Sequence, residues 1–171
     1  LSSKNNQMRK VNNVLANANC LNMLNGKYII YNPKARPIKN PNAMGPAWFV
    51  DKIKWVKDAN AEIGAIDATN LRNTAIVHQN FKEDISGITE SSDSLANIKL
   101  VHNEPNHLIY ETKAASKNLA VLSEIYYEHG WKATLDGEPI PVYRANYALR
   151  ALEIPAGEHK LELTFEPDSY Y

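Results

Sequence analysis

The chain is short of three things: cysteine, an excess of charge of either sign, and long hydrophobic runs. One cysteine, Cys20, occurs among 171 residues, which excludes an internal disulfide. Its apolar neighbours Leu15, Leu21 and Leu24 predict that it is a small buried side chain. Nineteen basic and nineteen acidic residues cancel. Because nucleic-acid binding requires a basic surplus, we do not expect a nucleic-acid partner.

The hydrophobic runs fall short of the roughly 20 apolar residues that a membrane-spanning helix requires. The N-terminal residues are too polar for a signal peptide. The chain does not begin with Met, and it stops abruptly after Tyr171. We therefore expect both ends to be cuts in a longer protein.

Motifs for catalysis, phosphate binding and metal binding are also missing. There is no G-x-S-x-G, P-loop or G-x-G-x-x-G sequence. The five histidines form no Cys/His cluster. His102 and His107 flank a turn, where either a metal site or two solvated turn histidines would fit. We expect no active site, no metal and no cofactor.

What the chain does contain is a series of short strands with a turn signal at each break. The C-terminal strands are expected at Leu119–Tyr127, Trp131–Leu135, Arg144–Ile154 and Lys160–Glu166. Asp136-Gly137 supplies the positive φ angles that a tight hairpin needs. The strict alternation of the last strand predicts a half-buried antiparallel sheet.

The N-terminal half is more mixed. Apolar residues spaced by three and four predict a helix over Asn5–Asn25, with Asn25-Gly26 as its C-terminal cap. The expected elements after it are a buried strand at Lys27–Tyr31, a loop over Asn32–Pro46, a strand at Ala47–Val56 and a short helix capped by Asp58.

Together these elements predict a mostly β fold with an α+β N-terminal part. We expect an antiparallel β-sandwich of about eight strands, with an N-terminal helix and one short helix. Residues 93–171 would form the sandwich core. Residues 1–92 would either add strands to it or form a small α/β cap on it.

The most suggestive candidate site is the run Arg144-Ala-Asn-Tyr-Ala-Leu-Arg150. On a single strand, Arg144, Asn146 and Arg150 share one face. Two guanidinium groups and an amide there could hold a phosphate, a carboxylate or sugar hydroxyls. The alternative is a solvated face on which the arginines pair with nearby Glu residues.

Two aromatic residues complete the candidate ligand-binding set. Trp131 could stack on a sugar ring, or it could fill the core of the sandwich. Tyr126 precedes Tyr127, so the pair sends one ring to each face of a strand, and at least one hydroxyl would be wet.

The C-terminal part contains, in order, Glu124-Ile-Tyr-Tyr127, Gly130-Trp-Lys-Ala133, Arg144-Ala-Asn-Tyr147 and Ile154-Pro-Ala-Gly-Glu-His159. With other pieces in the same order, they closely resemble the C-terminal segment of the YfhO-like family of bacterial multi-pass membrane proteins. The resemblance covers most of the chain and is weakest from Lys57 to Ser94.

The resemblance implies a soluble segment on the outer face of the cytoplasmic membrane, with Phe165–Tyr171 leading into a final membrane helix. Family members look like polytopic glycosyltransferases that use polyprenyl-phosphate sugars, with the catalytic acid elsewhere in the protein. The expected partners are the transmembrane part of the same protein and a cell-envelope glycan or lipid-linked sugar.

The expected function is thus that of a non-catalytic extracytoplasmic domain that helps hold an acceptor glycan. The alternatives are a structural module that docks membrane subunits, and a free-standing glycan-active enzyme.

Overall fold

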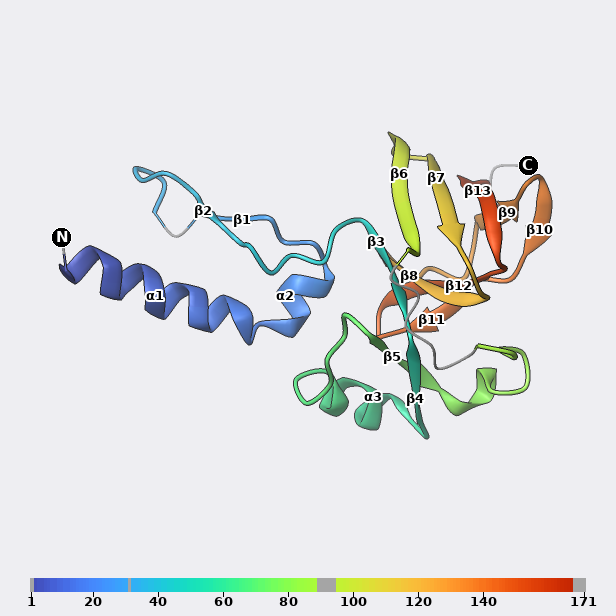
Figure 1. Ribbon diagram of the computed structural model, residues 1–171, viewed down its shortest axis with the longest axis horizontal. Helices are drawn as coiled ribbons and strands as arrows, with labels where there is room; N and C mark the ends of the chain where they lie inside the picture. The colour runs from blue at the N-terminus through green and yellow to red at the C-terminus, as the bar shows by residue number, and fades with distance from the viewer. Residues whose placement is uncertain (1, 31, 89–94, 168–171) are drawn as a thin grey trace.

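The computed structural model describes residues 2–30, 32–88 and 95–167, and two packed β-sheets dominate it (Figure 1). The five-stranded sheet is antiparallel, in the order β10-β9-β13-β7-β6. Its strands are β6 (Asn97–Glu104), β7 (His107–Ala114), β9 (Trp131–Leu135), β10 (Glu138–Ile140) and β13 (Gly157–Phe165). The prediction of a β-rich α+β fold is confirmed.

The second sheet has six strands in the order β3-β8-β12-β11-β5-β4. They are β3 (Ala47–Val50), β4 (Lys52–Val56), β5 (Thr74–His78), β8 (Asn118–Ile125), β11 (Tyr143–Ala145) and β12 (Leu149–Ile154). The pairing of β4 with β5 is parallel, and the other pairings are antiparallel. Helix α3 (Ala59–Ala65) and the 3₁₀ turn η1 (Gln79–Phe81) flank β5 in the sequence.

The predicted strand over Ala47–Val56 is one stretch interrupted at Asp51. Its first half, β3, pairs with β8, and its second half, β4, pairs with β5. The two halves therefore form the two opposite edges of the six-stranded sheet. Because only Asp51 separates these edges, the sheet is strongly curled.

The six-stranded sheet is buried on both faces, and β12 shows how. Leu152 and Ile154 face the five-stranded sheet, where they pack in a cluster with Tyr110 of β7. Leu149 and Ala151, on the opposite face, belong to a second cluster that includes Ala65 of α3. Such two-sided burial fits the continuous apolar run Leu119–Leu122 of β8, whereas Arg150 and Glu153 interrupt the apolar pattern of β12.

Residues on both sides of the expected boundary contribute to the same sheet. Strands β3, β4 and β5 come before residue 92, and β8, β11 and β12 come after it. The boundary at residues 92 and 93 lies outside the described residues, as does the end of the segment expected to lead into a membrane helix, at Tyr170 and Tyr171.

The expected helix over Asn5–Asn25 is broken into α1 (Ser2–Ala16) and α2 (Asn19–Met23). Asn17 lies in the break, where its side-chain amide donates to the carbonyl of Asn13 at 2.8 Å. This local bond competes with the helical pattern. The break turns Cys20 outward, so the prediction of a buried cysteine is wrong. The expected cap is confirmed, because Asn25 adopts a φ of 56°.

The predicted buried strand at Lys27–Tyr31 is also wrong in its burial. Strand β1 (Tyr28–Ile29) pairs with β2 (Ile38–Lys39), which lies in the expected loop. Tyr28 and Ile30 are 65% and 70% exposed. The reason is visible in Figure 1, where this hairpin and α1 project away from the two sheets. We call residues 2–46 the N-terminal arm.

Candidate functional site

The run from Arg144 to Arg150 folds as a hairpin and not as one strand, which corrects the prediction that its polar residues share a strand face. Strand β11 ends at Ala145, and β12 begins at Leu149. Asn146 and Tyr147 in the turn have φ angles of 50° and 71°. Asn adopts this left-handed region more readily than most residues, so the sequence favours a turn here.

Asn146 is fully buried and holds the turn against β5. Its backbone N–H donates to the carbonyl of Ile76 at 2.8 Å, and its side-chain oxygen accepts from the N–H of Ile76 at 2.9 Å. The side-chain oxygen and the backbone N–H of Asn146 together engage both backbone groups of Ile76, which fixes the turn on the neighbouring strand. Asn146 therefore has a structural position, away from any open surface.

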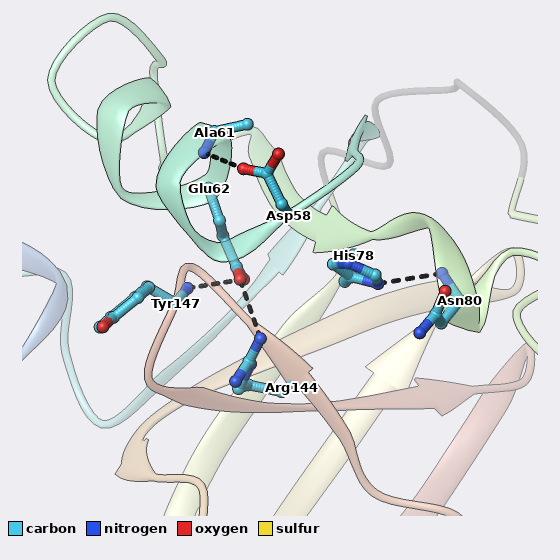
Figure 2. A network of polar contacts seen from close by, with 7 residues as sticks. All are labelled: Asp58, Ala61, Glu62, His78, Asn80, Arg144 and Tyr147. Atoms are coloured by element: carbon cyan, nitrogen blue, oxygen red, sulfur yellow. Dashed lines mark hydrogen bonds and ion pairs between the residues drawn. The ribbon is translucent and has the colours of Figure 1, made fainter.

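Arg144 lies in a polar network beneath α3 (Figure 2). Its guanidinium group lies 3.2 Å from a carboxylate oxygen of Glu62, which is fully buried. The other oxygen of Glu62 accepts from the backbone N–H of Tyr147 at 2.8 Å. Asp58 caps the same helix by accepting from Ala61 N–H at 2.8 Å. The network ties α3 to the β11–β12 turn.

Arg150 is 3% exposed and lies against Trp131, with its guanidinium carbon 4.0 Å from the centre of the indole ring. This is the geometry of a cation–π contact. Its Nε–H donates to the carbonyl of Ile125 at 3.0 Å, while its Nη1 is buried without a hydrogen-bond partner among the described residues. Burial lowers the pKa of Arg150, and the nearby Glu124 partly opposes that effect.

Trp131 begins β9 directly after a glycine that the fold requires. Gly130 has a φ of 100°, and a Cβ atom there would lie 2.8 Å from Phe165 and 3.0 Å from Pro167. The indole ring lies 5.3 Å from the ring of Phe165 on the paired strand β13. The position of Trp131 is therefore set by its own strand, by Phe165 and by Arg150.

Tyr126, Trp131 and Arg150 meet at a surface cleft of about 370 Å³. The loop between β8 and β9 supplies Tyr126, and the β9–β10 hairpin supplies Trp131 and several other lining residues. The remaining lining residues are Tyr127, Glu128, Lys132, Ala133, Thr134, Pro139, Ile140 and Val142. Three of the five predicted ligand-binding residues thus come together, whereas Arg144 and Asn146 lie outside the cleft.

Burial affects the pKa of Tyr126 in the cleft and of Tyr110 in the core. Burial raises the pKa of the Tyr126 hydroxyl, as does the neighbouring carboxylate of Glu128, while Arg144 lowers it. Burial also raises the pKa of Tyr110, a core residue of the cluster against which Trp131 packs. A neutral hydroxyl can both donate and accept a hydrogen bond, as recognition of sugar hydroxyls requires.

Glu62 is the main polar residue that sequence reasoning missed. Its position in the first turn of α3, four residues after the cap Asp58, is one that many solvated Glu residues share. Nothing in the local sequence distinguishes a buried carboxylate from an exposed one. Its partners, Arg144 and Tyr147, follow it by more than eighty residues.

The two turn histidines lie close together, with ring centres 5.0 Å apart. Each is engaged by a carboxylate: His102 by Glu104 at 3.4 Å and His107 by Glu162 at 2.5 Å. Across the described ranges, no three His, Cys, Asp or Glu side chains converge in a way that could hold a metal ion.

Comparison with known proteins identifies the family. Residues 63–171, the part that carries the cleft, match the family described as "Bacterial membrane protein YfhO". This chain belongs to the YfhO family. It is also 28% identical over 97 residues to the uncharacterized protein YfhO of Bacillus subtilis (strain 168).

That match spans 57% of this chain and 11% of the Bacillus protein. The chain therefore corresponds to a small part of a much longer YfhO relative. No solved structure matches it. In the part of the chain that the structure describes, no helix is both long and apolar enough to cross a bilayer.

Proposed function

We propose that this part of the YfhO-family protein is a non-catalytic domain on the outer face of the cytoplasmic membrane, and that its cleft contributes to binding of a cell-envelope glycan. Residues 93–171 would form most of its sandwich core, and strands β3, β4 and β5 from the part before residue 92 would complete it. The whole protein would be a glycosyltransferase that uses polyprenyl-phosphate sugars, with its catalytic groups in the membrane-embedded part.

The observation that carries the glycan proposal is the meeting of Tyr126, Trp131 and Arg150 at one cleft. Aromatic rings offer apolar faces to the C–H groups of a sugar, and the tyrosine hydroxyl and nearby charges offer partners to its hydroxyls. The volume of about 370 Å³ lies within the range of small-molecule sites. It would accept a short stretch of a glycan.

A hydrolase is disfavoured by the composition of the same cleft. Glycoside hydrolysis requires two carboxyl groups that face each other across the scissile bond. Among the described lining residues, Glu128 is the one acid.

The proposal is tested by titrating the chain with envelope-type oligosaccharides and phospho-sugars, followed by calorimetry and by NMR of the cleft residues. Tyr126→Ala should weaken binding by about fivefold or more, as loss of an interface hot-spot residue does. Tyr28→Ala, which removes an exposed tyrosine in the arm, should leave glycan affinity unchanged. Absence of binding to every glycan tested would overturn the proposal, as would equal losses in both variants.

The second candidate is a structural module that docks membrane subunits. It is favoured by the observation that Arg150 and Trp131 already contact each other and that Asn146 is used inside the fold. Under this alternative, Arg150→Gln would lower the stability of the domain, and no glycan would bind to either form.

A further inference from the structure

The charges of this chain are segregated along the sequence although they cancel overall. The first fifty residues contain seven Lys and Arg residues and no Asp or Glu. All nineteen acidic residues follow, together with the other twelve basic ones, so the first fifty residues carry +7 and the rest carries −7. Because the seven basic residues all precede residue 40, the whole positive excess lies in the N-terminal arm.

The basic side chains of the arm face solvent. Those whose exposure the structure describes are Arg9, Lys10, Lys27, Lys34, Arg36 and Lys39, and all six are exposed. None of these six forms an ion pair within the described ranges, as the arm contains no carboxylate side chain to pair with. Their charges are therefore available to an external anion.

Apolar side chains are exposed on the same arm. Val14 of α1, Tyr28 of β1 and Ile30 beyond it are 68%, 65% and 70% exposed. Tyr28 lies directly opposite Lys39 in the β1–β2 pairing. A groove of about 700 Å³ beside this hairpin is lined by Lys27, Tyr28 and Lys39, among others.

At the base of the arm the buried side-chain amides of Asn22 and Asn40 bond to each other, whereas Val14, Tyr28 and Ile30 farther out are exposed. A two-stranded hairpin is marginal in water without a surface to pack against, and so is a single helix of about 15 residues. Figure 1 shows both elements projecting from the sheets, joined to the body through α2. Met23 in α2 is buried in the body, and its carbonyl accepts from the hydroxyl of Ser123 at 2.8 Å.

From this combination we infer that the N-terminal arm binds the anionic headgroup surface of a lipid bilayer. Exposed Lys and Arg attract anionic headgroups, and Tyr and aliphatic residues enter the boundary between headgroups and chains. A bilayer supplies both the charge and the apolar surface that the arm lacks. Docking of the arm would hold the sandwich, whose net charge is negative, away from the headgroups.

A second copy of the chain would offer less than a bilayer does. The acidic sandwich could attract a neighbour's arm, but several of its carboxylates are already paired within the body. Glu62 pairs with Arg144, Glu153 with Lys117 and Glu158 with Lys113. Self-association would also leave Tyr28 and Ile30 facing a charged surface.

The test uses the whole chain and sedimented vesicles of phosphatidylcholine, with and without phosphatidylglycerol. Binding should require phosphatidylglycerol and should fall when the salt is raised from about 0.1 M to 1 M, because the Debye length shrinks from ~10 Å to ~3 Å. Lys27→Gln, Lys34→Gln and Lys39→Gln together should weaken binding roughly a hundredfold, at about fivefold for each cation removed.

The matched control replaces three exposed lysines of the body, Lys52, Lys82 and Lys99, by Gln. Overall charge changes equally in the two triple variants, so only the position of the charge differs. The control should bind vesicles as the unchanged chain does. Equal losses in both variants, or binding to phosphatidylcholine alone, would overturn the inference.

A probe in the arm tests contact with the bilayer directly. The three tryptophans lie outside the arm, at positions 48, 55 and 131. Tyr28→Trp should show a blue-shifted emission and protection from an aqueous quencher when anionic vesicles are added. An unchanged spectrum would overturn the inference, as would formation of dimers in sedimentation velocity or tighter binding to an oligonucleotide than to the vesicles.

Discussion

The sandwich and the N-terminal arm differ in how far the chain itself covers their apolar side chains and pairs their charges. In the sandwich, β8 and β12 are apolar on both faces and are covered on both, and many surface charges have partners. In the arm, one sign of charge stands beside exposed Tyr28 and Ile30, and the described residues supply no cover. The body covers most of its own apolar side chains, whereas the arm has the composition of an element whose apolar and basic side chains contact another surface.

The largest predicted difference between the two regions is the loss of stability when one apolar side chain is removed from each. Leu152→Ala, between the two sheets, should lower the free energy of unfolding by about 2–5 kcal/mol because it leaves a cavity in a packed core. Val14→Ala, in the arm, should change it by no more than about 0.5 kcal/mol. Urea denaturation of both variants measures the difference. Similar losses would show that the arm packs as firmly as the body.

The buried carboxylate provides the next largest effect. Glu62→Gln keeps an oxygen for Tyr147 N–H but removes the negative charge beside Arg144, so the domain should lose about 2 kcal/mol of stability. Glu83→Gln, at an exposed position, is the matched control and should be neutral. Thermal denaturation of the pair checks this. If the two variants melt together, the network in Figure 2 does not stabilise the fold.

The smallest predicted effect is a pH dependence of stability that the body should show and the arm should not. The Lys160 backbone N–H and then His159 hold the pKa of Asp136 below its usual range, while Asp136 raises the pKa of His159. The His159 contribution is complete below the ordinary histidine pKa and is lost as the pH rises through the raised value. The Asp136 contribution is present above the ordinary aspartate pKa and is lost as the pH falls through the lowered value.

The pair should therefore stabilise the body most between these limits, and Asp136→Asn should flatten that part of the stability profile. Urea midpoints measured across the pH range check it. The arm contains no Asp, Glu or His, so its charge should not change over the same range. Vesicle binding that followed the His159 titration would contradict this separation.

The sequence predicts the body of the fold well because burial and pattern agree there. The strict alternation over Lys160–Glu166 appears as β13, and Asp136-Gly137 forms the turn between β9 and β10 with φ angles of 53° and 91°. These elements depend on local chemistry, since a residue that must adopt positive φ or alternate between two faces is recognisable by its type.

The remaining features depend on contacts between distant segments. Asn146 alone is a weak turn signal within the alternating pattern of Arg144–Ile154, and the contacts that hold the turn come from Ile76 and Glu62 elsewhere in the chain. The exposure of Tyr28 and Ile30 was missed for a related reason. An apolar pattern shows that a surface needs cover, but it does not show whether the same chain supplies that cover.

Residues Ala47–Val56 form both edge strands of the six-stranded sheet, β3 and β4, and these two strands find their partners at different times during synthesis. Trp55 of β4 pairs with Val77, which is synthesised soon after it, whereas Trp48 of β3 pairs with Val121, which is synthesised much later. Until β8 emerges, β3 presents an unpaired backbone that other chains can join. Pairing with β8 (Asn118–Ile125) then covers that side of β3. We therefore expect ribosome-bound chains in which β8 has not yet emerged to aggregate more than chains in which it has.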